Sequence, residues 1–357
     1  MVYKFKSFNL INLFYKYMKK INIIIIMFQL ETFVGLENLY KYLLNIEKFN
    51  VIIINCKNQD KRWIHNNDAI NYLNEKNYKY IRYEDGDLKY LKPNYVFYQT
   101  PYLSHFPKKI NINEVSKYSK ICYFSYGYNF FDPKYAMFPI DYLKKVNYYF
   151  VENEEIKKIW TNYLKFKKIN INTIEDLQKK CFVTGCPKIS NIKTEFNLKY
   201  RNIGWSPRWS PKMSNFENYY KYLTDLFINK SECNLISRFH PLDNNKNRKL
   251  FLNNINKIKN ITNDENEKYD FYFDKIDIFI SDMSTMIPEF FLTGKPIIYT
   301  YLNTHKINSF GKKLLEGVYI VKNKEELDKI LNNLINNIDP LREKRLELIN
   351  YSPQMTK

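Results

Sequence analysis

Two groups of polar residues in the second half of the chain have the types and spacing of a phosphate site. Arg238 and His240 follow the apolar pair Leu235–Ile236, and Pro241 ends the apolar run. An arginine presents a planar fork of donors to phosphate oxygens, and a histidine can donate a hydrogen bond or a proton near neutral pH. If the run is a strand, both side chains lie at its carboxyl end, where we expect them to bind an anion.

The second group lies in the polar turn Ser281–Thr285, which follows the apolar run Ile278–Ile280. The turn precedes a short helical pattern, and a helix start offers free N–H groups and the positive end of its dipole to a phosphate. The alternative is an ordinary helix cap that binds nothing. The presence of both groups at strand ends favours one site for a phosphate-bearing ligand. His305 also follows a strand pattern, and we expect it in a solvated loop.

Together these residues resemble the CDP-glycerol glycerophosphotransferase family, the teichoic-acid-type polymerases and primases with a GT-B fold. Arg238 and His240 match the family's Arg/Lys-x-His-Pro segment, and Ser281–Thr285 matches its Thr-Asp-Tyr-Ser-Ser segment. The resemblance extends from about residue 93 to about residue 321. Further matches are Val183–Lys188, Trp205–Trp209, Glu289–Phe290 and Lys295–Tyr299.

The resemblance implies that a nucleotide-activated donor, CDP-linked in the family, binds the C-terminal domain, with His240 also acting in catalysis. Arg208 and Trp209 supply a further cation and a ring that could stack on a base, or are ordinary loop residues. No other cofactor and no metal is implied, because GT-B enzymes stabilise the leaving diphosphate with cations and helix dipoles. The expected donor-binding residues are Arg238, His240, Ser281, Asp282, Ser284, Thr285 and Glu289, with Arg208 and Trp209 as weaker candidates.

The chain departs from the family at the expected catalytic base. The family's polymerases carry a His-Gly pair in the N-terminal domain, whereas here Tyr126 precedes Gly127. Tyrosine has an ordinary pKa near 10 and is a poor base at neutral pH. Either Tyr126 is the base, the base lies elsewhere, or the acceptor needs little activation. We expect Gly127 and Tyr128 on the acceptor side.

Three functions follow as hypotheses. The first is transfer of a glycerol-phosphate-type group from a CDP-activated donor to an acceptor hydroxyl, in synthesis of a teichoic-acid-like surface polymer. The second is a GT-B glycosyltransferase that uses a nucleotide sugar for capsule or lipopolysaccharide synthesis. The third is a non-catalytic binding or scaffold protein.

Strand and helix patterns alternate along the chain, which is typical of parallel α/β sheets. With the resemblance, this predicts a GT-B fold of two Rossmann-like domains facing across a cleft. We expect strands near residues 21–28, 51–56, 79–82, 95–99, 120–125, 147–152, 181–184, 202–206, 233–238, 258–262, 277–281, 296–300 and 318–321. The expected parts are a basic aromatic segment (1–19), an N-terminal acceptor-side domain (20–187), a linker (188–201), a C-terminal donor domain (202–350) and a tail (351–357).

The net charge of +19, from 56 basic and 37 acidic residues, favours anionic partners such as a phosphorylated substrate or an anionic membrane. Abundant Lys, Asn, Ile and Tyr also fit an AT-rich genome. No nucleic-acid-binding motif organises the aromatic residues, so nucleic acid is not an expected partner. The five cysteines form no CxxC pair, and the run Asp85–Asp87 indicates a turn rather than a metal site.

The N-terminal segment Met1–Lys19 interleaves aromatic residues with lysines. It is either a helix that lies on anionic lipid or a leader that precedes a true start at Met18. No run of about 20 apolar residues is long enough to span a bilayer. We therefore expect a cytoplasmic protein, peripheral to the inner face of the cell membrane, with a glycan or lipid-linked acceptor.

Overall fold

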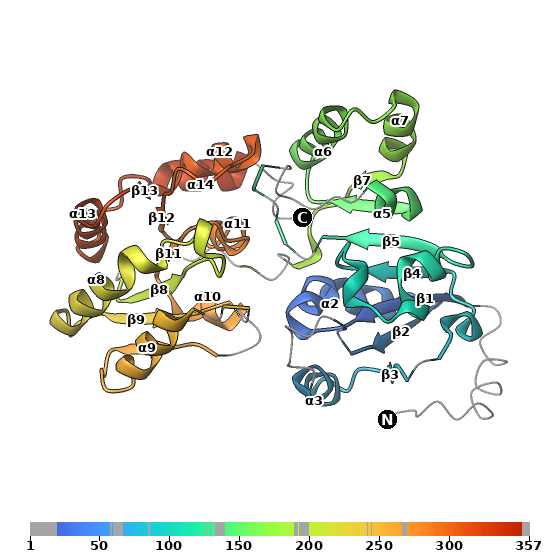
Figure 1. Cartoon of the computed structure of the whole chain (residues 1–357), viewed down its shortest axis with the longest axis horizontal. Coiled ribbons are helices and arrows are strands. Elements are labelled where there is room, and N and C mark those ends of the chain that lie inside the picture. Colours follow the sequence, from blue (N-terminus) through green and yellow to red (C-terminus); the bar gives the residue numbers. More distant parts are fainter. Residues whose placement is uncertain are drawn as a thin grey trace. The chain divides into compact units, whose positions relative to one another are not determined.

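The computed structural model contains two compact units, each built around a parallel sheet (Figure 1). The first unit comprises Met1–Gly127 and Pro133–Ser190, and the second comprises Tyr128–Asp132 and Asn191–Thr356. The structure describes residues 20–57, 59, 67–84, 86–125, 127–128, 130–132, 140–188, 192, 200–240, 242–243, 245–265 and 270–351. Most of the expected linker and the whole segment 1–19 lie outside these ranges.

The sheet of the first unit has seven strands in the order β3-β2-β1-β4-β5-β6-β7, all parallel. Its interior strand β1 has the sequence INIIIIM, and a continuous apolar run of this kind suits a strand that is covered on both faces. The strands are β1 (Ile21–Met27), β2 (Phe49–Asn55), β3 (Tyr80–Arg82), β4 (Tyr95–Tyr98), β5 (Lys120–Phe124), β6 (Tyr148–Val151) and β7 (Cys181–Val183). The α-helices are α2 (Leu30–Leu44), α3 (Asn67–Glu75), α4 (Ile112–Val115), α5 (Ile140–Lys145), α6 (Glu154–Phe166) and α7 (Ile171–Lys179).

The sheet of the second unit has six strands in the order β10-β9-β8-β11-β12-β13, again all parallel. The strands are β8 (Asn202–Ser206), β9 (Asn234–Ser237), β10 (Ile261–Asn263), β11 (Ile278–Ser281), β12 (Ile297–Thr300) and β13 (Tyr319–Val321). The α-helices are α8 (Phe216–Asn229), α9 (Lys246–Ile255), α10 (Asp270–Lys275), α11 (Met286–Phe291), α12 (Ser309–Leu315), α13 (Lys324–Ile335) and α14 (Arg342–Tyr351).

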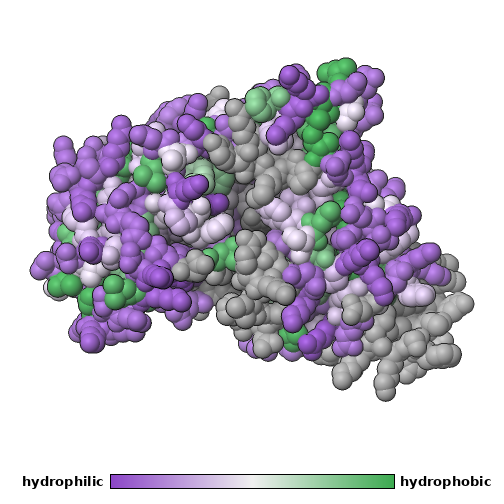
Figure 2. Space-filling model, in the orientation of Figure 1, coloured by the Kyte–Doolittle hydropathy of each residue, from purple (hydrophilic) through white to green (hydrophobic). Residues whose placement is uncertain are grey.

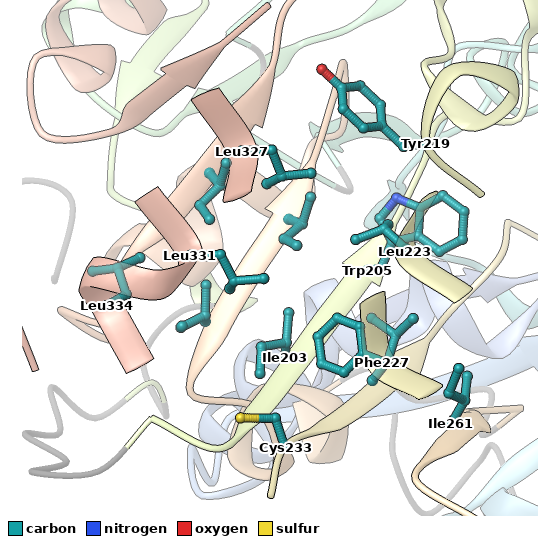
Figure 3. Close-up of a cluster of buried hydrophobic side chains, with 14 of the residues drawn as sticks. Ile203, Trp205, Tyr219, Leu223, Phe227, Cys233, Ile261, Leu327, Leu331 and Leu334 are labelled. Carbon is teal, nitrogen blue, oxygen red and sulfur yellow. The ribbon is translucent and has the colours of Figure 1, made fainter. Parts of the chain in front are cut away.

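The core of the second unit fixes the central strand β8 against its covering helices (Figure 3). Trp205 of β8 is buried beside Leu223 of α8, and α13 contributes Leu327, Leu331 and Leu334. These three leucines are spaced by four and three residues, so they form one apolar stripe of a helix. On β8, a side chain at Gly204 would come within 2.5 Å of Ile276 Cδ1, so only glycine allows this close packing.

The strand order places a topological switch point at β8. The chain runs outward from β8 through β9 to β10, then crosses to β11 and runs the other way to β13. The connections that leave β8 and β11 therefore run in opposite directions, and the carboxyl ends of two such strands are where α/β proteins bind ligands. The two parallel-sheet Rossmann-like domains expected from the sequence are confirmed. Among the described residues, no helix is both long and apolar enough to span a membrane.

Candidate functional site

Three loops meet at the carboxyl edge of the second unit's sheet. They follow β8, β9 and β11, and they carry Arg208 and Trp209, His240, and the turn Ser281–Thr285. The Arg208 guanidinium donates from Nη1 to the carbonyl oxygen of Met283 at 3.0 Å. The Trp209 and His240 rings are 5.8 Å apart between centroids. The structure thus brings both of the predicted polar groups together, with the weaker candidates Arg208 and Trp209 between them.

Asp282 holds two of these loops in place. Its carboxylate accepts hydrogen bonds from the backbone N–H groups of Arg208 at 2.6 Å and of Asn215 at 2.9 Å. The side chain is fully buried, and burial raises the pKa of the Asp282 carboxyl to about 7 against the opposing effect of these donors. Asp282 therefore positions the Arg208 loop, and its direct contact with a donor stays a prediction.

The hydroxyls of the same turn divide into two kinds. Ser281 is buried and donates from Oγ to the carbonyl oxygen of Ser206 at 2.6 Å, which ties the ends of β11 and β8 together. Ser284 and Thr285 are partly exposed at the start of α11. The Ser284 Oγ accepts a hydrogen bond from the N–H of Met286 at 3.2 Å. Ser284 and Thr285 are the hydroxyls of this turn that a ligand could reach, whereas Glu289 is buried within α11.

Arg238 has a carboxylate partner that the sequence did not reveal. Its Nη1 lies 2.5 Å from Asp264 Oδ2, and Lys275 Nζ lies 3.1 Å from the other oxygen of that carboxylate. The register of β9 and β10 pairs Ser237 with Asn263, so the next residues on the two strands meet. The expected phosphate-binding fork of Arg238 is therefore shared with a buried acid, which lowers the net charge it offers to a ligand.

His240 is neutral in this structure and has a defined tautomer. Its Nδ1 accepts a hydrogen bond from the N–H of Leu242 at 3.1 Å, so the ring proton is assigned to Nε2. Burial, and then the positive charges of Arg208, Arg248 and Arg238, lower the pKa of His240 to about 3. The imidazole can therefore donate a hydrogen bond at neutral pH, but it is not protonated to the imidazolium and so cannot act as a general acid from that form.

Arg248 is a member of the site that the sequence analysis missed. It lies in the first turn of α9, and its Nη1 donates to the carbonyl oxygens of His240 (3.2 Å) and Asp243. Its guanidinium lies over the Phe239 ring at 4.8 Å. The feature of the sequence that could have identified it is an arginine in the next helix after the segment Arg238–Pro241. Three guanidinium groups near one neutral imidazole make this edge favourable for an anion.

Of the residues expected on the acceptor side, Gly127 and Tyr128 are described and belong to different units. Tyr126 is outside the described residues, and Gly127 is a buried residue of the first unit. Tyr128 belongs to the second unit, where it is fully buried and stacks on Phe310 at 5.9 Å. Tyr128 is therefore a core residue of the second unit, and no part of its ring is exposed to an acceptor.

His305 is buried rather than solvated, so that prediction was wrong. Its Nδ1 lies 2.7 Å from the Tyr299 hydroxyl and accepts from the N–H of Leu302, and its Nε2 lies 3.1 Å from the Met213 carbonyl oxygen. Burial lowers the pKa of His305 to about 4. The ring connects the loop after β12 to the segment that leads to Asn215, one of the donors to Asp282.

The turn expected around Asp85–Asp87 is described in part. Asp87 caps a short 3₁₀ helix by accepting from the N–H of Lys89 at 2.8 Å, and Asp85 lies outside the described residues. Within the described ranges, no group of three or more His, Cys, Asp or Glu side chains could hold a metal ion.

No protein-family model matches the chain, and no curated protein matches its sequence. Solved structures, in contrast, match over nearly its whole length. A Listeria monocytogenes protein described as a UDP-N-acetylglucosamine 2-epimerase has a TM-score of 0.65 and 13% identity over 93% of this chain and 91% of its own. The UDP-GlcNAc 2-epimerase from Neisseria meningitidis, with bound UDP-GlcNAc, has a TM-score of 0.62 and 12% identity over 94% and 96%.

The wall teichoic acid polymerase TagF, in a crystal soaked with CDPG, has a TM-score of 0.60 and 12% identity over 94% of this chain and 84% of its own. The chain has the GT-B fold. At these identities the likeness establishes the fold of a GT-B protein, and the neighbours include both epimerases and a polymerase. The resemblance seen in the sequence therefore agrees with one of two groups of GT-B neighbours.

Proposed function

We propose that this GT-B protein is a transferase of cell-surface polymer synthesis that moves a glycerol-phosphate-type group from a CDP-activated donor to an acceptor hydroxyl. The observation that carries the proposal is the convergence of Arg208, Arg248 and neutral His240 at the switch point of the second unit. The sequence resemblance and the TagF likeness support the CDP-linked donor.

In this proposal the donor's diphosphate occupies the edge beside His240. The Nε2–H of His240 donates to a phosphate oxygen, and the guanidinium groups of Arg208 and Arg248 offset its negative charge. The Trp209 ring lies beside His240 and is available to stack on the base. The hydroxyls of Ser284 and Thr285 are partly exposed on the opposite loop and can donate to the same phosphates.

The reaction follows from this arrangement. The acceptor oxygen forms a bond to the phosphorus that carries the glycerol, the bond from that phosphorus to the CMP oxygen breaks, and CMP leaves with the negative charge. Cations that are already in place stabilise this developing charge without reorganising. The hydroxyl proton passes to a base. Tyr126 is the candidate that the resemblance indicates, and its ordinary pKa makes it a weak one.

The second candidate is a GT-B enzyme that acts on a nucleotide sugar. The specific observations in its favour are the UDP-GlcNAc 2-epimerase neighbours and the absence of histidine at position 126. The same cations would serve a UDP-linked diphosphate equally well. The described residues of this edge give no reason to prefer one base over another, so the donor must be decided by experiment. A scaffold protein would turn over none of these donors.

A donor panel tests the proposal. The full chain is titrated calorimetrically with CDP-glycerol, CDP-ribitol and UDP-GlcNAc, and turnover is followed by release of the nucleotide. The matched pair of variants is Arg248→Gln at the site and Arg82→Gln on the exposed surface of the first unit. Loss of a charge-assisted contact of about 1.5–3 kcal/mol should weaken donor affinity about tenfold to a hundredfold in Arg248→Gln alone.

Each outcome decides between the candidates. Turnover of CDP-polyols supports the proposal, whereas turnover of UDP-GlcNAc alone replaces it with the nucleotide-sugar function. Equal affinities in Arg248→Gln and Arg82→Gln would show that the assigned edge does not bind the donor. We also propose that the acceptor is a glycan or a lipid-linked glycan at the inner face of the membrane, with Met1–Lys19 as one contact. A shortened chain that starts at Met18 tests that contact.

A further inference from the structure

The connection between α6 and α7 exposes apolar and basic side chains together. Phe166 ends α6 with 57% of its surface exposed, and Ile171 begins α7 with 56% exposed. Lys165 directly precedes Phe166, Lys167 and Lys168 follow it, and all three lysines are exposed. We name residues 165–171 the α6–α7 tip. Single apolar residues are common on protein surfaces, so the tip becomes informative only through its charge and its surroundings.

The stretch of chain that contains the tip carries charge of one sign. The stretch from Ile156 to Ile174 contains five lysines and no aspartate or glutamate. Glu155 and Glu175 are the acidic residues that border it in sequence. A protein surface usually mixes both signs, and a one-signed stretch attracts an anionic surface.

A second apolar flank of α6 leads into the tip. The core-facing side of this helix carries Ile156, Trp160 and Leu164, which are buried. Ile159, Tyr163 and Phe166 lie at helical spacing on the adjoining side; the first two are partly exposed and Phe166 is exposed. Lys167 Nζ lies 5.6 Å from the centre of the Tyr163 ring. Figure 2 shows apolar surface over α6 and α7 among hydrophilic side chains.

The backbone of the tip is held in one turn. The N–H of Lys168 donates to the Lys165 carbonyl oxygen at 2.9 Å, and the N–H of Ile169 donates to that of Leu164 at 3.2 Å. The Asn170 side chain then caps α7 by accepting from the N–H of Asn172 at 2.8 Å. A turn that is already ordered loses little conformational entropy when it binds a surface.

We infer that the α6–α7 tip docks this protein on an anionic lipid bilayer. Lys165, Lys167 and Lys168 attract the acidic headgroups, while Phe166 and Ile171 enter the interface between headgroups and acyl chains. The tip would supplement the contact proposed for the N-terminal segment, since stable peripheral binding usually needs more than one weak signal. The inference concerns the first unit alone and does not rest on the identity of the donor.

Vesicle co-sedimentation of the full chain tests the inference, with phosphatidylcholine vesicles that contain or lack phosphatidylglycerol. The test variant replaces Lys165, Lys167 and Lys168 with glutamine. Each lysine near an anionic membrane contributes about fivefold to partitioning, so the triple change should weaken binding about a hundredfold. The matched control replaces the exposed Lys249, Lys257 and Lys259 of the second unit with glutamine and removes the same charge. We expect this control to bind like the wild type.

A second pair of variants tests the contribution of the apolar side chains to vesicle binding. Phe166→Ser should weaken binding to the anionic vesicles, and Leu250→Ser, at a residue that is 51% exposed on α9, should not. Phe166→Trp should retain binding, and its fluorescence should shift to the blue with anionic vesicles because the indole enters the interface.

Three results would overturn the inference. These are equal recovery with neutral and anionic vesicles, wild-type binding by the α6–α7 lysine variant, and equal loss in that variant and its control. The last would assign binding to the net charge of the chain. Because vesicle binding needs no donor, a failed donor panel leaves this test intact, and failed docking leaves the donor panel intact.

Discussion

Replacement of Asp282 by asparagine should change how the stability of the protein depends on pH. The pKa of the buried carboxyl is raised from its ordinary value of 3.8 to about 7, so the folded chain binds more protons than the unfolded chain between these values. The contribution of this group to stability is therefore full below pH 3.8 and is lost as the pH rises through 7. Asparagine does not titrate and removes this dependence.

The magnitude follows from the shift. From about pH 4.5 to about pH 7 the contribution of this carboxyl to the free energy of unfolding falls by about 3 kcal/mol, because each pKa unit corresponds to about 1.4 kcal/mol. The difference in free energy of unfolding between the wild type and Asp282→Asn should move by this amount, in favour of the variant at high pH. At every pH the variant also loses one strong acceptor for the N–H groups of Arg208 and Asn215.

Urea unfolding, followed by tryptophan fluorescence across this pH range, measures the difference. Taking the difference between the two proteins cancels every other titrating group, including His240 and His305. A difference that does not change with pH would refute the reasoning that burial raises the pKa of the Asp282 carboxyl in the folded chain. Donor affinity provides a second readout, because a displaced Arg208 loop should weaken it while the fold persists.

Three further predictions concern buried groups. The depressed pKa of His305 stabilises the folded chain above its ordinary value of 6.5, so stability should fall as the pH drops from 6.5 toward 4; His305→Gln should flatten this part of the profile in thermal unfolding. Gly204→Ala should cost about 1–3 kcal/mol in urea unfolding, since the added Cβ meets Ile276, whereas Ala at an exposed site should not. Arg345→Met leaves the buried Asp339 carboxylate without its arginine and should cost about 3–5 kcal/mol; the double change with Asp339→Asn should recover part of that loss.

Much of the fold could be predicted from the sequence because its periodicity is strong. The apolar runs at Ile21–Met27 and Ile278–Ile280 form interior strands of the two sheets, and the expected alternation of strands and helices is observed in both units. The two polar groups at strand ends could be predicted to share an edge, because parallel strands carry their carboxyl ends to one side. Arg238 and His240 accordingly lie on the same edge as the turn after β11.

Other features depended on contacts between distant segments. The pairing of Arg238 with Asp264 follows from the register of β9 and β10, which no local pattern encodes. The segment Tyr128–Asp132 belongs to the second unit although the chain on both sides of it belongs to the first. His305 looked like a solvated loop residue, yet its ring is buried and its Nε2 contacts the carbonyl oxygen of Met213, 92 residues earlier in the chain.

By itself the sequence determined the fold class, the strand ends and the residue types of the candidate anion site, since these depend on local periodicity and turn chemistry. Tertiary structure alone decided which of those residues keep their charge for a ligand. In the folded chain Asp282 holds the Arg208 loop, and Arg238 forms an ion pair with Asp264. Arg248 lies beside His240, and burial keeps His240 neutral. The physical reason is that pKa and charge depend on burial and on the nearest opposite or like charge, and both are set by segments that meet only after folding.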